Sequence, residues 1–455
     1  MLDLFIIMSK NNLQYFLLGL ILLVHAFILT KVIFFPYPEL FIYPYLTNHG
    51  LKPYTQILDQ HFPGLMFLPI NFDNLGMNNE AAARVWLIGV VIITHLLLFF
   101  IARHLFKSSF KALLVNLLYL VWQPFFEGWV LWIDNFLPLI LLPAFYVLYK
   151  RKFLITGILL GLGIVLKQTI IPLSIFVLIY MLLTKRDFKT VLFYLLGLFI
   201  PVGLTAAYLV GIGVFWDFWY WTVIFNLTIY AKFGRGEGPT LAHFSRVLLV
   251  FGSSLLVIRG IKLREVQILL IFLAGTLLGL STRFDFVHFQ PALPFALIAF
   301  VYSFKWLNKF LRWSIIVIYG LTIVWWLAIF YRGHIGNRIV SFDSNTMTLA
   351  AKVRSYTRPG DRIFVFGGEP QLYQMSKTLP AGNIFVFQFP WFYKVAEGRV
   401  LEGIKQDEPG IIVADKTMEI EGVKIIDFAR DIDQYIQSNY QRIDNVGTAE
   451  ILKRK

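Results

Sequence analysis

Residues 13–35 read LQYFLLGLILLVHAFILTKVIFF, a run in which Lys31 is the one charged side chain. At about 1.5 Å per residue, a helix of this length crosses the roughly 30 Å hydrocarbon core of a bilayer. The run is too long for the apolar core of a signal peptide, and no small-residue cleavage site precedes the polar residues that follow it. We therefore expect it to remain in the chain as a membrane anchor.

The composition is typical of a polytopic α-helical membrane protein. Of the 455 residues, 58% are hydrophobic and 15% are charged, and the mean hydropathy is +0.67. The formal charge of +14 does not indicate a nucleic-acid partner, because the basic residues recur in short clusters between apolar runs, which is a signal of membrane topology. Since the chain has no cysteine, it can form neither disulfides nor a thiolate metal site.

About eleven apolar runs are long enough, or nearly so, to cross a bilayer. They lie near residues 13–35, 82–102, 109–123, 129–149, 153–167, 169–184, 190–213, 245–260, 266–281, 291–304 and 313–331. With the N-terminus in the cytoplasm, every inward-facing loop is rich in Lys or Arg and the outward loops carry mixed charge. The positive-inside rule therefore predicts an integral protein of the cell membrane with its C-terminal segment outside.

The pattern changes near Asp343. Residues 348–368, TLAAKVRSYTRPGDRIFVFGG, predict an amphipathic helix, a turn and a short apolar strand, and NIFVF (383–387) and GIIVAD (410–415) predict two more strands. We predict a transmembrane domain over residues 1–335 and a small extracytoplasmic α/β domain over residues 343–455, large enough to have its own core.

The outward loop 36–81 contains the longest polar interruption in the first half of the chain, PELFIYPYLTNHGLKPYTQILDQHFPG at 38–64. Glu39 lies within about one turn of the bilayer, and Asp59 and His61 are close in sequence. A carboxylate at a membrane surface is partly desolvated, which raises its pKa and suits it to act as a general base when a cation keeps it ionised. Glu39 and Asp59 are therefore candidate catalytic residues. The alternative is that both are ordinary solvated loop residues.

Asp134 lies in EGWVLWIDNFLPLILL, a run that otherwise predicts a spanning helix. An acid in such a helix costs about 2.5–3.5 kcal/mol unless it faces protein or water, so we interpret Asp134 as functional. Glu127, seven residues earlier, would share its face if the helix extended that far. We interpret Glu127 as a capping or interfacial acid.

Three basic residues on outward segments could converge on one anion. Lys167 lies in GIVLKQTIIP, and Arg283 and His288 lie in STRFDFVHFQPALP. A compact ammonium suits a lipid phosphate, although Lys167 could also snorkel to the interface and Arg283 could pair with Asp285. The chain has no Walker A, Rossmann or zinc-binding spacing, so we predict no soluble nucleotide donor, cofactor or metal ligand; the sequence leaves a divalent metal requirement open.

These motifs resemble those of C-type membrane glycosyltransferases, in the family 39-like bacterial branch similar to protein O-mannosyltransferases and lipid A aminoarabinose transferase. The first-loop acid with GLKPY and ILDQHFPGL resembles the first outer loop of the family, and WVLWIDNFLPL resembles the segment with its second-loop acid. GLGIVLKQT is similar to the lysine-bearing short helix, and RFDFVHFQPALP to the Arg…His…Pro segment. FVFGGEPQLYQMS and PGIIVAD resemble parts of the outer C-terminal domain.

The resemblance implies inverting transfer of a sugar from a polyprenyl-phosphate donor to a hydroxyl of a glycan, lipid or protein acceptor at the outer face of the membrane. It assigns Glu39 as the base and Asp134 as a supporting or acceptor-orienting acid. It assigns the donor phosphate to Lys167, Arg283 and His288.

The chain departs from the family pattern in the first outer loop. The family usually has an acidic pair where this chain has Pro38-Glu39, so the base is either Glu39 or Asp59. His61 and Phe62 stand where Lys-Pro is common, which makes His61 the candidate phosphate ligand at this place.

Other classes of protein remain as alternatives. A polytopic transporter or a lipid-linked glycan flippase would concentrate ionisable residues near the bilayer midplane, on discontinuous helices. An O-antigen polymerase or ligase would favour arginines and a histidine in large outer loops, without the first-loop acid. An enzymatically inactive scaffold of the same fold is kept open by Pro38.

Overall fold

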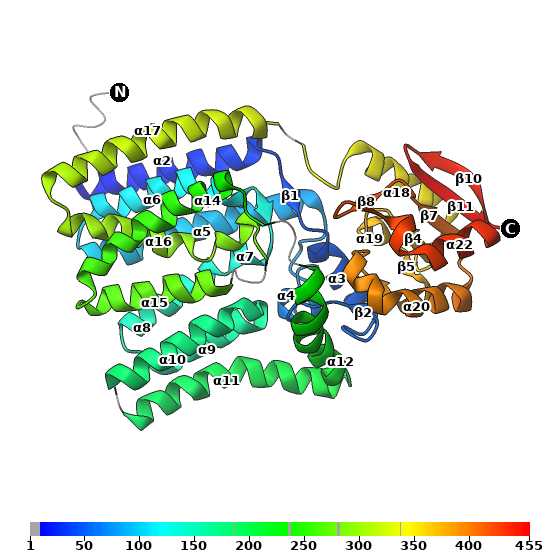
Figure 1. The fold of residues 1–455 in the computed structure, drawn as a ribbon, viewed down its shortest axis with the longest axis horizontal. Coiled ribbons are helices and arrows are strands. Elements are labelled where there is room, and N and C mark those ends of the chain that lie inside the picture. Colours follow the sequence, from blue (N-terminus) through cyan, green and yellow to red (C-terminus); the bar gives the residue numbers. More distant parts are fainter. Residues whose placement is uncertain (1–9, 186, 235–237, 280–282, 337) are drawn as a thin grey trace. The chain divides into compact units, whose positions relative to one another are not determined.

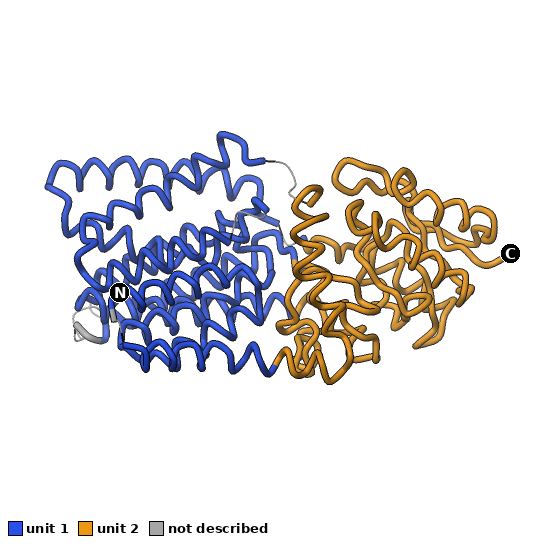
Figure 2. Tube along the Cα trace, turned by 60° about the horizontal axis from the view of Figure 1, so that its bottom comes forward, with its two compact units in different colours: residues 1–35, 83–204, 237–338 blue, residues 36–82, 205–236, 339–455 orange. Residues whose placement is uncertain are grey.

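The computed structural model describes residues 10–185, 187–234, 238–279, 283–336 and 338–455. Its chain divides into two compact units, each assembled from three separate segments (Figure 2). Unit 1 comprises residues 1–35, 83–204 and 237–338, and unit 2 comprises residues 36–82, 205–236 and 339–455. The two domains drawn from the sequence, 1–335 and 343–455, stay a prediction.

Unit 1 is built from helices (Figure 1). In chain order, its elements are α2 (Lys10–Lys31), α5 (Glu80–Phe106), α6 (Ser109–Gln123), η1 (Pro124–Gly128), β3 (Val130–Leu131), α7 (Ile133–Phe136), α8 (Pro138–Tyr149), α9 (Phe153–Leu166), η2 (Gln168–Ile170), α10 (Ile171–Lys185), α11 (Phe188–Gly211), α14 (Leu241–Val247), η4 (Leu248–Gly252), η5 (Leu255–Gly260), α15 (Arg264–Leu278), η7 (Phe286–Phe289), α16 (Leu293–Ser303), η8 (Phe304–Trp306) and α17 (Lys309–His334). The first three residues of α5 and the end of α11 belong to unit 2, and β1 (Phe35–Pro36) lies at the boundary.

Five helical segments are long and apolar enough to cross a membrane: Asn12–Lys31, Glu80–Phe106, Phe188–Gly211, Leu241–Gly260 and Lys309–His334. Shorter apolar helices cover Ile133–Tyr149, Phe153–Leu166, Gln168–Thr184 and Leu293–Trp306. Large apolar side chains on these segments, such as Leu23, Val85, Leu183 and Leu204, are exposed, as expected for side chains that face lipid. The chain therefore has the helices of an integral membrane protein, while the total of eleven spans stays a prediction.

Helices α9 and α11 approach closely because glycines face the contact. Gly157 and Gly161 lie about one turn apart on α9. A Cβ atom at Gly157 would lie 2.1 Å from the carbonyl oxygen of Tyr194, and one at Gly161 would lie 2.4 Å from that of Leu198. Small residues four positions apart allow helix backbones to approach within a bilayer.

A chain of buried polar side chains joins α2, α5 and α6. His25 Nδ1 lies 2.8 Å from His95 Nε2, and His95 Nδ1 lies 2.7 Å from Asn116 Oδ1. On its other side, His25 Nε2 lies 3.0 Å from Gln123 Oε1. All four side chains are fully buried. Because polar groups in an apolar surrounding need partners, this chain restricts how the three helices can rotate against one another.

Unit 2 combines helices with a mixed sheet (Figure 1). Its elements are α3 (Glu39–Asn48), β2 (Ile57–Leu58), α4 (Gly64–Phe67), α12 (Phe215–Trp219), η3 (Tyr220–Tyr230), α13 (Ala231–Phe233), α18 (Ser344–Tyr356), β4 (Arg362–Phe366), α19 (Leu372–Ser376), β5 (Leu379–Pro380), η9 (Ala381–Asn383), β6 (Phe385–Val386), α20 (Pro390–Asp407), β7 (Ile411–Ala414), β8 (Glu419–Ile420), β9 (Val423–Lys424), α21 (Ile425–Phe428), α22 (Arg430–Asn439), β10 (Tyr440–Val446) and β11 (Ala449–Arg454).

Five strands of unit 2 form one sheet in the order β10–β11–β7–β4–β5. Strand β4 is parallel to both β5 and β7, whereas β11 is antiparallel to β7 and to β10. The central strands read RIFVF and IIVA and are buried along nearly their whole length. Continuous apolar runs of this kind are expected for parallel strands that are covered on both faces.

A short parallel pair joins the first segment of unit 2 to its last. In the pair of β2 with β6, Ile57 lies opposite Phe385 and Leu58 opposite Val386. The backbone N–H of Phe385 also donates a hydrogen bond of 2.8 Å to the carbonyl of Gln56. The position of Asp59, the residue after β2, therefore depends on the C-terminal part of the chain.

Residues 215–233, which lie between the apolar runs predicted near 190–213 and 245–260, are helical throughout as α12, η3 and α13. This stretch contains no proline or glycine. Its side chains contact other segments of unit 2. The ring of Phe225 stacks on that of Phe392 at 5.2 Å, and Asn226 Nδ2 donates to the carbonyl of Gln60 at 3.0 Å. Packing against other segments therefore makes a helix of this stretch.

The close approach of α9 and α11 predicts that Gly157→Ala destabilises the protein by about 1–3 kcal/mol, because the added methyl group meets backbone that cannot move aside cheaply. Gly203→Ala on α11 is the matched control, since no atom of the residues that the structure describes lies within 4 Å of a Cβ atom there. Thermal unfolding of both variants in detergent measures the difference. Equal midpoints for the two variants would contradict the proposed contact.

Candidate functional site

Asp134 lies in the first turn of α7, behind the extended residue Trp132. The backbone N–H of Trp132 donates to Asn135 Oδ1 at 3.0 Å, which secures the start of the helix. The helix begins at Ile133, because η1 and β3 occupy the preceding residues. Asp134 and Glu127 therefore do not share one helix, and their seven-residue spacing does not place them on one helix face.

Lys167 lies at a break between two helices. Helix α9 ends at Leu166, and Lys167 has an extended backbone with φ −156° and ψ 123° before η2 and α10 begin. Its N–H still donates to the carbonyl of Gly163 at 2.9 Å. The break turns the chain at a charged residue and leaves the lysine side chain inside the unit, where 7% of the residue is exposed.

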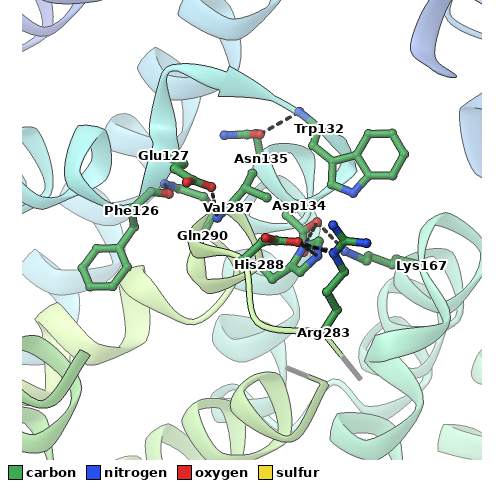
Figure 3. Close-up of polar contacts among 11 residues, drawn as sticks. Phe126, Glu127, Trp132, Asp134, Asn135, Lys167, Arg283, Val287, His288 and Gln290 are labelled. Carbon is green, nitrogen blue, oxygen red and sulfur yellow. Dashed lines mark hydrogen bonds and ion pairs between the residues drawn. The ribbon is translucent and has the colours of Figure 1, made fainter. Parts of the chain in front are cut away.

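Asp134, Lys167 and His288 meet in unit 1, and we call these three residues the ionic cluster (Figure 3). Lys167 Nζ contacts Asp134 Oδ2, and His288 Nδ1 lies 3.0 Å from the same oxygen. Lys167 Nζ also lies 3.2 Å from His288 Nδ1. Asp134 is 2% exposed, whereas His288 is partly exposed. A buried ammonium and a buried carboxylate thus compensate each other beside an imidazole that remains accessible.

Arg283 lies next to the ionic cluster (Figure 3), and Asp285 pairs with it. Arg283 Nε donates to Asp285 Oδ2 at 2.7 Å, and the same oxygen lies 3.9 Å from His288 Nε2. Both residues are about one-third exposed. The three basic residues that the sequence analysis expected to converge are therefore brought together around two carboxylates, and their role as phosphate ligands stays a prediction.

Glu127 supports the segment that carries His288. Its Oε2 accepts a hydrogen bond of 3.2 Å from the N–H of Val287, and Gln290 Nε2 donates to the carbonyl of Phe126 at 2.7 Å (Figure 3). Burial, with the nearby charge of Asp285 as a second cause, raises the pKa of Glu127 above its ordinary value. Glu127, interpreted from the sequence as a capping or interfacial acid, thus contacts η7 through the N–H of Val287.

A second group of ionisable residues lies in unit 2 around Asp59. Asp59 Oδ2 accepts from the Tyr43 hydroxyl at 2.6 Å, and Oδ1 accepts from the backbone N–H of His61 at 2.7 Å. His61 Nδ1 lies 2.9 Å from Oδ1, and the Tyr54 hydroxyl donates to the His61 carbonyl at 2.9 Å. Asp59 is 1% exposed and both of its oxygens are engaged, so it acts as an anchor for His61.

Tyr43 was not singled out from the sequence, because a tyrosine in an aromatic stretch has no distinguishing pattern. Its ring packs against those of Phe67, Phe385 and Phe387, at centroid distances of 4.8, 6.0 and 5.6 Å. Burial and the adjacent charge of Asp59 raise the pKa of Tyr43 well above its ordinary value. The hydroxyl therefore stays protonated and keeps donating to Asp59.

Glu39 is the first residue of α3, directly after Pro38, which already has helical φ and ψ of −56° and −29°. Residues 39–46 of this helix are all buried, and Glu39 itself is 8% exposed. A carboxylate at a helix N-terminus is stabilised by the unpaired N–H groups there. Pro38, which replaces one acid of the expected acidic pair, thus precedes the helix, and Glu39 is the acidic residue in the first turn of α3.

The buried pair predicts that Asp134→Asn destabilises the protein by about 3–5 kcal/mol, because the variant leaves the Lys167 ammonium buried without its counter-charge. Asp427→Asn makes the same chemical change at an exposed position and is expected to cost under about 0.5 kcal/mol. Thermal unfolding of the purified variants distinguishes these outcomes. An unchanged midpoint for Asp134→Asn would show that Lys167 does not depend on Asp134.

Residues 60–210 match the family model of dolichyl-phosphate-mannose-protein mannosyltransferases. The chain shares its fold with ArnT from Cupriavidus metallidurans. The ArnT structure bound to undecaprenyl phosphate matches with a TM-score of 0.67, at 11% identity over 98% of both chains, and the apo structure with a TM-score of 0.64, also at 11% over 98% of both. No curated protein matches the chain in sequence. These likenesses confirm the resemblance to C-type membrane glycosyltransferases that the sequence indicated.

Proposed function

We propose that this chain, with its C-type glycosyltransferase fold, transfers a sugar from a polyprenyl-phosphate donor to an acceptor hydroxyl at the outer face of the membrane, with inversion at the sugar carbon. The observation that carries the proposal is the ionic cluster, in which a buried lysine is held beside an accessible histidine. The fold of the chain supports the same class of donor, because ArnT with this fold binds undecaprenyl phosphate.

In this proposal the ionic cluster binds the phosphate of the donor, which becomes the leaving group. Lys167 has three N–H donors, and its contact with Asp134 holds the ammonium in place before the donor arrives. Charge-assisted hydrogen bonds to phosphate are strong, and groups that are positioned in advance stabilise the charge that develops as the sugar–phosphate bond breaks. His288 and Arg283 are more exposed than Lys167 and supply further donors at this place.

We assign the base to Glu39. In a single displacement, the acceptor oxygen forms a bond to the sugar carbon, the bond from that carbon to the phosphate oxygen breaks, and the proton of the acceptor hydroxyl passes to the base. Asp59 is less suited to this step, because Tyr43 and His61 already occupy both of its oxygens. We assign Asp59 to positioning His61, which serves as an additional phosphate ligand.

The proposal includes the membrane topology. Eleven spans, a cytoplasmic N-terminus and an extracytoplasmic C-terminal domain follow from the placement of Lys and Arg in alternate loops. The five long apolar helices and the shorter apolar ones support this arrangement. The acceptor, a glycan, lipid or protein, would then reach the enzyme from the aqueous side.

The base assignment predicts that Glu39→Gln lowers sugar transfer about 10²–10⁴-fold, because the amide keeps the shape of the side chain but cannot take the proton. Transfer is measured with purified protein in nanodiscs, offered radiolabelled polyprenyl-phosphate sugars with lipid and glycan acceptors. Glu80→Gln, the same change at the start of α5, is the control and keeps wild-type transfer.

Each other result has a defined meaning. Transfer that survives in Glu39→Gln removes Glu39 from the mechanism and moves the base to Asp59 or Asp134. Saturable binding of a polyprenyl phosphate without turnover of any donor would instead favour a flippase, whose expected discontinuous helices would include the break at Lys167. The absence of both polyprenyl-phosphate binding and sugar transfer would overturn the proposal.

A further inference from the structure

Unit 2 contains a cavity of about 180 Å³ at one edge of its five-stranded sheet. Gly367 to Pro370, which follow β4, line one side, and Met418 and Ile420, which follow β7, line another. Strand β6 and the residues after it also line the cavity. The carboxyl ends of adjacent parallel strands are the usual place for a ligand in a sheet of this kind. Neither the ionic cluster nor the Asp59 group lines this cavity.

The glycine at this edge is required by its surroundings. Gly367 has φ +70°, which favours glycine, and a Cβ atom there would lie 2.1 Å from the carbonyl oxygen of Asp415. Gln388 Oε1 accepts a hydrogen bond of 2.6 Å from the N–H of Gly367. The turn after β4 is therefore built to bring backbone and Glu369 to the cavity wall.

Two polar side chains, those of Tyr393 and Glu369, are among the residues that line the cavity. Tyr393 is 3% exposed, and its hydroxyl oxygen has no hydrogen-bond partner within the described part of the chain. Glu369 is partly exposed; its carboxyl group accepts a hydrogen bond of 3.2 Å from Gln371 and also hydrogen-bonds the Ser341 side chain. A buried hydroxyl without a partner is costly, so its presence in a cavity wall indicates a group that a ligand can satisfy.

The rest of the wall restricts the chemistry of that ligand. It is largely apolar and includes aromatic side chains from Phe364, Tyr373, Phe385, Phe387, Phe389 and Tyr393. None of its described residues is Lys, Arg or His, which disfavours phosphates and carboxylates. Burial raises the pKa of Glu369, and its carboxyl group can hydrogen-bond a neutral hydroxyl. The volume suits one ring, since a cavity of roughly 150 Å³ holds benzene.

We propose that this cavity binds one neutral, hydroxylated sugar ring, with an apolar face of the ring against the aromatic side chains and ring hydroxyls on Tyr393 and Glu369. Its wall is directly connected to the Asp59 group: Phe385 belongs to β6, which pairs with β2, and Phe385 and Phe387 both contact the Tyr43 ring that serves Asp59. The ring is then a sugar of the acceptor glycan, an assignment that rests on the transferase function proposed above.

The test measures binding of methyl glycosides of neutral hexoses to the full chain in nanodiscs, by saturation-transfer NMR and calorimetry. Tyr393→Phe removes one hydroxyl and keeps the ring, so affinity is expected to fall about fivefold to tenfold, the value of one hydrogen bond. Glu369→Gln is expected to retain binding or weaken it less than tenfold. Tyr440→Phe is the matched control, because Tyr440 is also buried and its hydroxyl has no hydrogen-bond partner among the described residues, but it does not line the cavity.

Three results would overturn the proposal: no saturable binding of any neutral hexoside, equal affinity of wild type and Tyr393→Phe, or preference for an amino or carboxyl sugar over its neutral counterpart. Binding of undecaprenyl phosphate by the same samples separates the two proposals. If the cavity proposal alone fails, polyprenyl-phosphate binding and transfer remain. If the transferase proposal alone fails, the neutral sugar still binds and transfer is absent in every variant.

Discussion

The arrangement of unit 1 depends on the need to compensate an ammonium and a carboxylate that are both buried among apolar helices. Moving either Lys167 or Asp134 into such surroundings alone would cost several kcal/mol, so the two residues must be in contact, and the helices that carry them must end where this contact can form. Helix α9 stops at Leu166, and α7 starts one residue before Asp134. His288 reaches the same oxygen from η7, which Glu127 and Gln290 attach to η1.

The polar residues of unit 2 are positioned by pairing between distant segments. The first segment of the unit, residues 36–82, has two residues in β2, and their partners lie more than 300 positions later in β6. Asp59 follows this pair immediately, and Tyr43 reaches it from α3. Both oxygens of Asp59 already accept hydrogen bonds. Glu39, at the start of α3, is therefore the better candidate for a proton acceptor.

Features with a local signature could be predicted from the sequence. Hydropathy located the helical segments, and Asp134 stood out because charge is rare in apolar runs. Lys167 and His288 stood out as basic residues on outward segments. The start of α7 at Ile133 and the helical character of residues 215–233 could not be predicted, because they depend on packing against other segments. The same reason explains why Tyr43 and the cavity in unit 2 were missed: their partners are brought together by β2–β6 pairing and by the sheet, and neither leaves a pattern in the sequence.

The most direct test of the central claim, that the ionic cluster binds a lipid phosphate, is the affinity for undecaprenyl phosphate of the double variant Asp134→Asn, Lys167→Met in nanodiscs. Removing both charges leaves the net charge unchanged and no buried charge unpaired, so the variant should fold. Our account predicts binding about tenfold to a hundredfold weaker than wild type, the value of a charge-assisted hydrogen bond. The control, Lys352→Met with Asp444→Asn, removes a 2.7 Å ion pair in unit 2 and should bind normally. Wild-type affinity in a folded Asp134→Asn, Lys167→Met variant would contradict the account.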